Sequence, residues 1–420
     1  MTTSPWWRIG WRNLGRNPRR TVLTATGLAF GYWAVVVITG MADGLVADMV
    51  RTATGVLSGQ VQAHAPTYLP DRTLYATIGG DEGVDVAALL AAVEAEPGVL
   101  GAAPRVYAGG LVSSGATTVG VLLLGADPAR EESVSRLAAA LVDGRLATAG
   151  ARELLIGREL ARQLDVAPGS ELVVVAPAAD GSLGNDLFTV AGLYASGIAE
   201  LDARTAVGPI DAIQALLVLG SGRVHEIAIR IADPWSAPFI ADSLARRVAA
   251  PGAYAIAFRP WTTFRPELVD YANLSSGSMW IVVLIVFAMA IFGVANTLLM
   301  TTFERRREFA LLLALGATPA GIVRTVLAEA VALGVISILL GVVITVPVLV
   351  WWHYDPIDLS RLFGDFTMAG ALVRPVLRTD YPVAMFFYAG GALLVTALLA
   401  ALYPAYRATR VPPADTLAGR

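Results

Sequence analysis

TTFERRREFALLLALGATPAGIVRTVLAEA, residues 301–330, places a short run of charges between two long segments that carry none. One Arg costs about 2.5–3.5 kcal/mol at the centre of a bilayer, so Arg305, Arg306 and Arg307 together would cost roughly 8–10 kcal/mol there. The chain must therefore leave the membrane at these residues. The following EFALLLALGATPAGI is predicted to form a helix with one apolar face, which Gly316 closes before Pro319 begins the next helix.

The composition indicates a membrane protein. Of the 420 residues, 55% are hydrophobic and only 15% are charged, whereas soluble domains carry about 25% charged residues. Four segments are long and apolar enough to span a bilayer, which takes about 20 residues per helix. They are 21–42, 276–303, 327–352 and 381–406. For the first segment a signal peptide, with Arg19 and Arg20 as its basic flank, is the alternative.

The distribution of Arg predicts the orientation. The chain contains no Lys. The first twenty residues hold five Arg and no acid, Arg also clusters at 305–307 and in the C-terminal tail, and the 353–380 segment instead mixes Asp with Arg. Positive charge favours the cytoplasmic side, so both termini should be cytoplasmic in a bacterial inner (cytoplasmic) membrane. The chain is predicted to begin with a cytoplasmic amphipathic helix (1–20), the first span (21–42) and a periplasmic domain (43–275). The second span (276–303), a cytoplasmic helix (304–326) and the third span (327–352) follow. A periplasmic loop (353–380), the fourth span (381–406) and a cytoplasmic tail (407–420) complete the order. For 1–20, a frayed basic flank is the alternative to a helix on the membrane surface.

The outer segment, 43–275, reads as a folded α/β domain. GQVQAHA at 59–65 alternates as a strand does. VDVAALLAAVEAEPGV at 84–99 has helical periodicity and ends at Pro-Gly. HEIAIRIADPWSAPFIADSLARRV at 225–248 reads as a strand, a turn and an amphipathic helix. The predicted fold class is an α-helical membrane protein with four transmembrane helices and a large extracytoplasmic α/β domain between the first and second helices.

Several kinds of chemistry are excluded by the residues present. A P-loop needs a Lys that reaches the phosphates, and this chain has none. With no Cys and three widely spaced His, thiolate and H-E-x-x-H metal sites are excluded. A net charge of −3 gives no reason to expect nucleic acid. We therefore expect a non-catalytic chain that itself binds no cofactor and no metal.

ERRREFALLLALGAT resembles the ERRREIGLLRALGAS element of ABC transporter permeases of the FtsX/MacB/LolC–LolE (type VII) superfamily. Four further stretches resemble that family in the same order along nearly the whole chain: WRNLGRNPRRT, GRELARQLDVAPGSELVV, FTVAGLYASGIAELD and YPAYRATRVPPADTLAGR. Lipoprotein-releasing permeases are the most similar members. Two positions depart from the family pattern: Leu313 stands where a base is usual, and Ala310 where Gly is usual.

The resemblance implies that the cytoplasmic helix is the coupling helix, which touches a separate ATPase. Its implied coupling residues are Arg305, Arg306, Arg307, Glu308, Leu311, Leu312, Leu315 and Gly316. Leu311, Leu312 and Leu315 are spaced to form one apolar ridge, and Glu308 is expected to pair with a base on the ATPase. ATP and Mg²⁺ would be bound by that partner, an ABC ATPase dimer.

The outer domain would divide, by the same resemblance, into a Porter-like part, 45–142 with 224–270, and an inserted Sabre-like part, 143–223. In lipoprotein-releasing permeases a hairpin of the Sabre part hooks a periplasmic carrier, and 176–186 is the matching place here. The hook candidates are Pro177, Asp180, Gly181, Leu183 and Gly184. A simple β-hairpin loop is the alternative.

Small residues recur four apart in the first span, as Gly27 with Gly31 and Gly40 with Gly44. Such spacing permits close helix packing, here against a second permease in a homo- or heterodimer. Simple tolerance of Gly in membrane helices is the alternative.

The function expected from these features is that of an ABC permease. It would couple ATP hydrolysis by its partner to movement of the outer domain, and release lipoproteins from the membrane lipid to a periplasmic carrier. Two alternatives remain open: export of a peptide, antibiotic or other amphiphile as in MacB, and signalling that activates an envelope hydrolase as in FtsX.

Overall fold

The computed structural model describes residues 15, 18–55, 57–80, 84–248, 256–358, 366–368, 371–373, 376–379, 383–412 and 416. Most of the predicted surface helix in 1–20 lies outside these residues. The chain divides into two compact units. One comprises 1–46, 272–361 and 376–420, and the other comprises 47–271 and 362–375.

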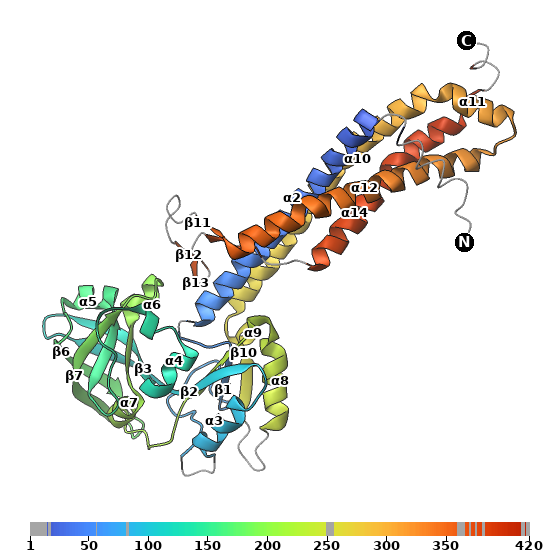
Figure 1. The fold of residues 1–420 in the computed structure, drawn as a ribbon. Coiled ribbons are helices and arrows are strands. Elements are labelled where there is room, and N and C mark those ends of the chain that lie inside the picture. The colour runs from blue at the N-terminus through green and yellow to red at the C-terminus, as the bar shows by residue number, and fades with distance from the viewer. Residues whose placement is uncertain are drawn as a thin grey trace. The chain divides into compact units, whose positions relative to one another are not determined.

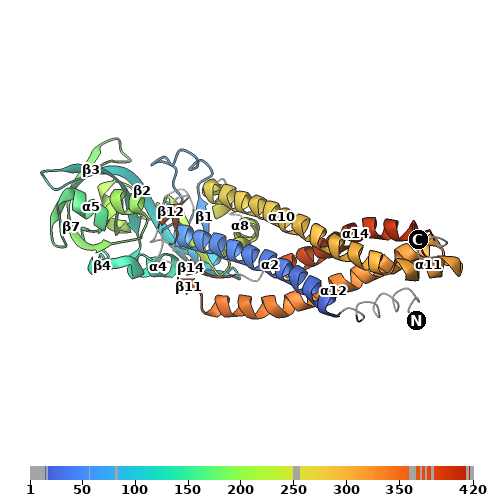
Figure 2. The ribbon, with the colours of Figure 1, turned by 90° about the horizontal axis from the view of Figure 1, so that it is seen from above.

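Four long apolar helices make up most of the first unit and confirm the four predicted spans (Figure 1). They are α2 (Pro18–Gly55), α10 (Pro266–Glu304), α12 (Pro319–Tyr354) and α14 (Val383–Thr409). Both views place α2 beside α10 and α12 beside α14 (Figures 1 and 2). Between α10 and α12 lies the short helix α11 (Arg306–Ala314).

Helix α2 extends well beyond the predicted end of its span at Ala42. It has 38 residues, and residues 47–55 belong to the second unit. The predicted span stops just before Asp43. The helix continues beyond this charge with an apolar stripe that includes the buried Val46, Met49, Val50 and Ala53. A helix continues past a charge when its apolar stripe remains buried.

One close contact between helices of the bundle is at Gly341, which the sequence did not single out. The ring of Tyr32 on α2 lies against Gly341 on α12, where an added Cβ would stand 2.6 Å from the ring atom Cδ1. The Tyr32 hydroxyl donates to the backbone oxygen of Phe386 at 3.1 Å. Glycine at 341 therefore lets one residue join α2 to both α12 and the start of α14.

The second unit is built on one ten-stranded mixed sheet, with strand order β10-β1-β9-β2-β3-β8-β5-β7-β4 and β6 paired with β2 and β7. The strands are β1 (Val61–His64), β2 (Val99–Ser113), β3 (Thr118–Ala126), β4 (Leu141–Gly144), β5 (Glu153–Gly157), β6 (Glu171–Pro177), β7 (Leu183–Tyr194), β8 (Thr205–Pro209), β9 (Glu226–Ile231) and β10 (Ala257–Pro260). The helices are α3 (Val86–Glu94), α4 (Pro128–Val134), α5 (Arg158–Leu164), α6 (Ala199–Arg204), α7 (Ile210–Leu216), α8 (Ala237–Arg247) and α9 (Trp261–Phe264), with 3₁₀ turns at Ala138–Ala140 and Pro234–Ser236. The predicted α/β domain is confirmed.

Pairing crosses the predicted division of this domain at residue 142. The far end of β2 pairs with β6 through Leu111–Ser113 and Val173–Val175, and β3 runs parallel to β8. Val106, Val112 and Leu123 from β2 and β3 share a core with Leu154, Leu172 and Phe188 from the later strands. One sheet therefore joins the two predicted parts.

The segment predicted as a loop after the third span contains two short antiparallel ladders. Strand β11 (Ile357–Asp358) pairs with β14 (Val376–Leu377), and β12 (Phe366–Met368) pairs with β13 (Ala371–Val373).

Candidate functional site

Helix α11 is bounded by the residues that the sequence singled out. It begins directly after α10, with Arg305 at its N-cap position. Gly316 follows its C-terminus at φ +90°, a conformation that glycine adopts without the strain a Cβ brings. The backbone N–H of Gly321 donates to the Thr318 side chain at 3.2 Å, which caps α12 next to Pro319. Both predicted boundaries of this segment are thus present in the structure.

The inner face of α11 packs on the helix bundle. Phe309 and Ala310 are almost completely buried, at 1% and 0% exposed, and Leu313 packs against the same core. The two departures from the family pattern, Ala310 and Leu313, both lie on this inner side. They therefore contribute to how α11 is seated on its own chain.

The outer face of α11 is an exposed apolar ridge. Leu311, Leu312 and Leu315 are 51%, 45% and 77% exposed. Large apolar side chains grouped outside a membrane core commonly mark a binding surface. The predicted ridge is therefore uncovered by the described part of this chain, as docking on another protein requires.

Arg305 turns inward and forms ion pairs within the chain. Its guanidinium donates to Glu308 at 3.0 Å and to Glu329 of α12 at 3.1 Å. It also lies 5.1 Å from the centre of the Phe309 ring. Glu308, which was expected to pair with a base on the ATPase, is thus already paired with Arg305. Arg306 and Arg307 are exposed.

The hook candidates form a tight β-turn between β6 and β7. Asp180 accepts hydrogen bonds from the N–H and hydroxyl of Ser182. The N–H of Ala179 donates to the backbone oxygen of Leu217 at 2.7 Å, and a Cβ on Gly184 would stand 2.0 Å from the oxygen of Leu216. The turn is therefore held against the end of α7.

The other hook candidates differ in how far they reach into solvent. Leu183 is 72% exposed. Pro177 and Gly181 are also exposed, but proline has a smaller side chain and glycine has none. Of the predicted set, Leu183 presents the largest apolar side chain for a carrier to contact.

The glycine pairs in the first span lie in different surroundings. Gly27 is exposed, with no atom within 4 Å of an added Cβ, whereas Gly31 faces Val286 of α10 at 3.5 Å. Gly40 and Gly44 are buried within the chain. Gly27 therefore leaves room for another helix to approach, whereas Gly31 packs on α10.

Gln60 links the two chain segments that enter and leave the outer domain, a role the sequence did not indicate. Its amide nitrogen donates to the Thr54 hydroxyl at the end of α2, and its side-chain oxygen accepts from the N–H of Ile231. Its backbone oxygen accepts from the N–H of Trp261 at 2.8 Å, just before α10. Trp261, only 1% exposed, also donates its indole N–H to Pro234. Gln60 therefore joins the end of α2, strand β9 and the start of α9 through hydrogen bonds.

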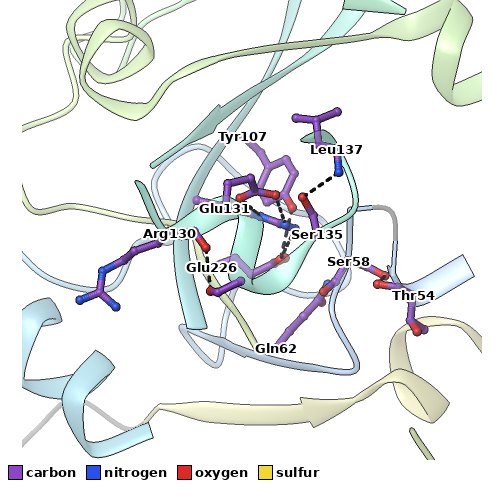
Figure 3. Close-up of polar contacts among 11 residues, drawn as sticks. Thr54, Ser58, Gln62, Tyr107, Arg130, Glu131, Ser135, Leu137 and Glu226 are labelled. Carbon is purple, nitrogen blue, oxygen red and sulfur yellow. Dashed lines mark hydrogen bonds and ion pairs between the residues drawn. The ribbon is translucent and has the colours of Figure 1, made fainter. Parts of the chain in front are cut away.

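A buried ion cluster lies in the same domain (Figure 3). Arg105 of β2, with a fully buried side chain, pairs with Glu131 of α4 at 2.6 Å and lies 3.9 Å from Glu226 of β9. The Tyr107 hydroxyl donates to Glu226 at 3.2 Å. Burial raises the pKa of Glu226 to about 7, although Arg105 opposes the shift. Glu131 is only 6% exposed, which its sequence neighbours do not indicate because its partner Arg105 lies 26 residues away on a different element.

The histidines of the outer domain are core residues. His225 is fully buried; its Nδ1 accepts from the backbone N–H of Tyr107 at 2.9 Å, and its Nε2 donates to the backbone oxygen of Leu74 at 2.9 Å. Burial lowers the pKa of His225 and of His64. Within the described residues no group of three or more His, Cys, Asp or Glu side chains is placed to hold a metal ion.

Two family models match the chain. The MacB-like periplasmic core domain matches residues 21–247, more than half of the chain, and the FtsX-like permease C-terminal domain matches residues 280–413. The first covers most of α2 and the sheet domain as far as α8, and the second covers α10 from residue 280 onward to the end of α14. Each structural unit is therefore matched over most of its length, and residues 248–279 lie between the two matches.

Curated relatives are similar over most of their length. The lipoprotein-releasing system transmembrane protein LolC of Neisseria meningitidis serogroup B is 25% identical over 94% of this chain and 93% of its own. LolC of Xylella fastidiosa (strain 9a5c) is 28% identical over 77% and 78%. LolE of Haemophilus influenzae is 22% identical over 77% and 79%.

Proposed function

Because this chain belongs to the permease family that joins a MacB-like periplasmic core domain to an FtsX-like C-terminal domain, we propose that it is the membrane subunit of an ABC transporter. A separate cytoplasmic ATPase dimer would bind ATP and Mg²⁺, and this chain would do no catalysis itself. The absence of Lys, and with it of a P-loop, supports that division of labour. A second permease, identical or related, would complete the complex.

The observation that carries the proposal is the two-faced packing of α11. Phe309 and Ala310 fasten the helix to the bundle, while Leu311, Leu312 and Leu315 stay exposed. A helix used only for stability would bury its larger apolar side. Here the ridge is free to enter a partner's pocket, and the buried side passes any displacement to the bundle.

Helix α11 is directly connected to two of the long apolar helices, α10 and α12. Only Arg305 separates α11 from the 39-residue helix α10, and Arg305 is also paired with α12 through Glu329. Movement of α11 on ATP binding would therefore displace α10 and α12 together. At the opposite end of α10, Trp261 and Gln60 tie the chain to the sheet.

Release of lipoproteins is the transport function that we propose. Its support is the similarity over most of the chain to relatives named for lipoprotein release. The substrate would be a lipoprotein held in the outer leaflet of the inner membrane, and a periplasmic carrier would accept it.

The direct test of the coupling role is the double variant Leu311→Asp with Leu315→Asp, which places two charges on the exposed ridge. A buried, unpaired charge costs several kcal/mol, enough to weaken a typical interface a hundredfold or more. The variant should insert normally but fail to co-purify with its ATPase. Leu100→Asp with Leu146→Asp is the matched control, since both leucines are exposed on the outer domain. Retention of the ATPase and full activity by the Leu311 and Leu315 variant would reject α11 as the coupling element.

A further inference from the structure

A cavity of about 120 Å³ lies where α10 ends, α11 begins and α14 ends. Its lining combines three guanidinium groups with a hydroxyl and apolar side chains: Leu299, Thr302, Phe303, Arg306, Arg407, Arg410 and Val411. No acidic residue is among these lining residues. Within the part of the chain that the structure describes, none of the three arginines is in an ion pair. The lining of the cavity therefore carries net positive charge.

Aromatic rings hold two of these arginines in place. The Arg407 guanidinium lies 5.8 Å from the centre of the Phe303 ring, and that of Arg410 lies 4.7 Å from the centre of the Tyr406 ring. Stacking occupies the flat face of a guanidinium and leaves its N–H edge free to bind phosphate oxygens. Part of the entropy cost of ordering these side chains is thus met before a ligand binds.

Exposed aromatic side chains lie near the cavity at the ends of two apolar helices. Phe303, Tyr403 and Tyr406 are 48%, 56% and 50% exposed at the ends of α10 and α14, two helices that are long and apolar enough to cross a membrane. Exposed aromatic side chains at the ends of spanning helices are typical of the headgroup region. We therefore expect the cavity to lie at the level of the lipid headgroups.

We propose that this cavity binds the phosphate of an anionic phospholipid, with Arg306, Arg407 and Arg410 on the phosphate oxygens. The apolar part of the lining, Leu299 and Val411, suits the glycerol and first methylenes of the lipid. The C-terminal dipoles of α10 and α14 oppose an anion with only about half an elementary charge each, against three full positive charges. Basic pockets between spanning helices bind acidic headgroups in this way.

This assignment changes the role of Arg306. It was implied by resemblance to be a coupling residue, yet it lines the cavity from the first turn of α11. A bound lipid would thus hold the start of the coupling helix against α14. The inference rests on the cavity and not on the identity of the transported substrate.

The test compares lipid retention by the full chain in nanodiscs of equimolar phosphatidylcholine and phosphatidylglycerol. After extraction into mild detergent, native mass spectrometry gives the ratio of the two lipids bound. The wild-type chain should retain phosphatidylglycerol preferentially. Arg407→Gln with Arg410→Gln should lower that preference by more than tenfold, since each base near the surface contributes roughly fivefold. Arg407→Lys with Arg410→Lys should lower it less, because the charge remains.

The matched control is Arg307→Gln with Arg324→Gln, which removes two exposed charges from the same cytoplasmic segment. The control should keep the wild-type preference for phosphatidylglycerol. Circular dichroism verifies that each of the three double variants is folded. Equal preference in the wild type and the Arg407/Arg410 variant would overturn the assignment. So would an equal loss in the control, which would reflect general surface charge. Displacement of the lipid by millimolar inorganic phosphate would show a soluble phosphate site and would also overturn it.

Discussion

Arg305 donates a hydrogen bond to Glu329 at 3.1 Å and so ties the start of α11 to α12. Both side chains are largely buried, at 14% and 9% exposed. A buried charge that loses its partner is strongly destabilising. This ion pair therefore fixes how α11 is seated on the bundle.

We expect Glu329→Gln to weaken that seating. The loss should be up to about 3 kcal/mol, moderated because Arg305 keeps Glu308 as a partner. The apparent unfolding midpoint in detergent should fall, and ATPase activity of the complex should respond less to substrate. Arg305→Gln should also be destabilising, and Arg305→Gln with Glu329→Gln should cost less than the sum of the two single losses, because either single change already breaks the pair. If the two losses simply add, the contact is not a direct ion pair that seats α11.

The turn at 178–182 gives a prediction about carrier contact. Because Leu183 is exposed and the turn is held in place by α7, Leu183→Ser should leave folding and basal ATPase activity unchanged. Transfer of a lipoprotein to a periplasmic carrier should fall severalfold. Leu100→Ser removes a similarly exposed leucine elsewhere on the outer domain and serves as the control. Normal transfer by Leu183→Ser would leave this turn a simple hairpin.

The predicted orientation can be tested with single cysteines, since the chain has none of its own. Ala116 is exposed in the turn between β2 and β3, and Ala320 is exposed at the start of α12. In intact cells a membrane-impermeant thiol reagent should label Ala116→Cys and should label Ala320→Cys only after lysis. Labelling of Ala320→Cys from outside would reverse the orientation and place the ridge of α11 in the periplasm.

The buried cluster predicts a pH dependence of stability. Folding raises the pKa of Glu226 to about 7 because the carboxyl is buried, so the folded state holds its proton more tightly than the unfolded state. That contribution is complete at acidic pH, below the ordinary Glu value, and is lost as the pH rises toward 7. Glu226→Gln cannot ionise, so its stability relative to the wild type should increase between pH 5 and pH 8.

The control for this titration is Glu153→Gln. A hydrogen bond from Arg145 holds the pKa of Glu153 well below its usual range, so this group stays ionised from pH 5 to pH 8. The difference from the wild type should therefore be constant across that interval. Thermal unfolding of the full chain at both pH values measures the two differences. A constant difference for Glu226→Gln would mean that Glu226 does not titrate in this range.

Much of this architecture was predictable because its signals are local. The uncharged runs predict the four long apolar helices, the Arg cluster at 305–307 predicts where the second of them ends, and Gly316 with Pro319 predicts the boundary between α11 and α12. Each of these rests on neighbouring residues and on the cost of placing charge or unsatisfied backbone in lipid.

The tertiary structure decided what depends on residues far apart in the chain. Both sides of α11 are apolar, so periodicity alone does not say whether Phe309 or Leu311 faces the bundle. The neighbouring helices decide it, and they bury Phe309. Likewise Arg305 meets Glu329 24 residues later, and Arg105 meets Glu226 across adjacent strands. Sequence fixes the charge and apolar content of each element, but only packing brings distant elements close enough for a charge to be paired and a face to be covered.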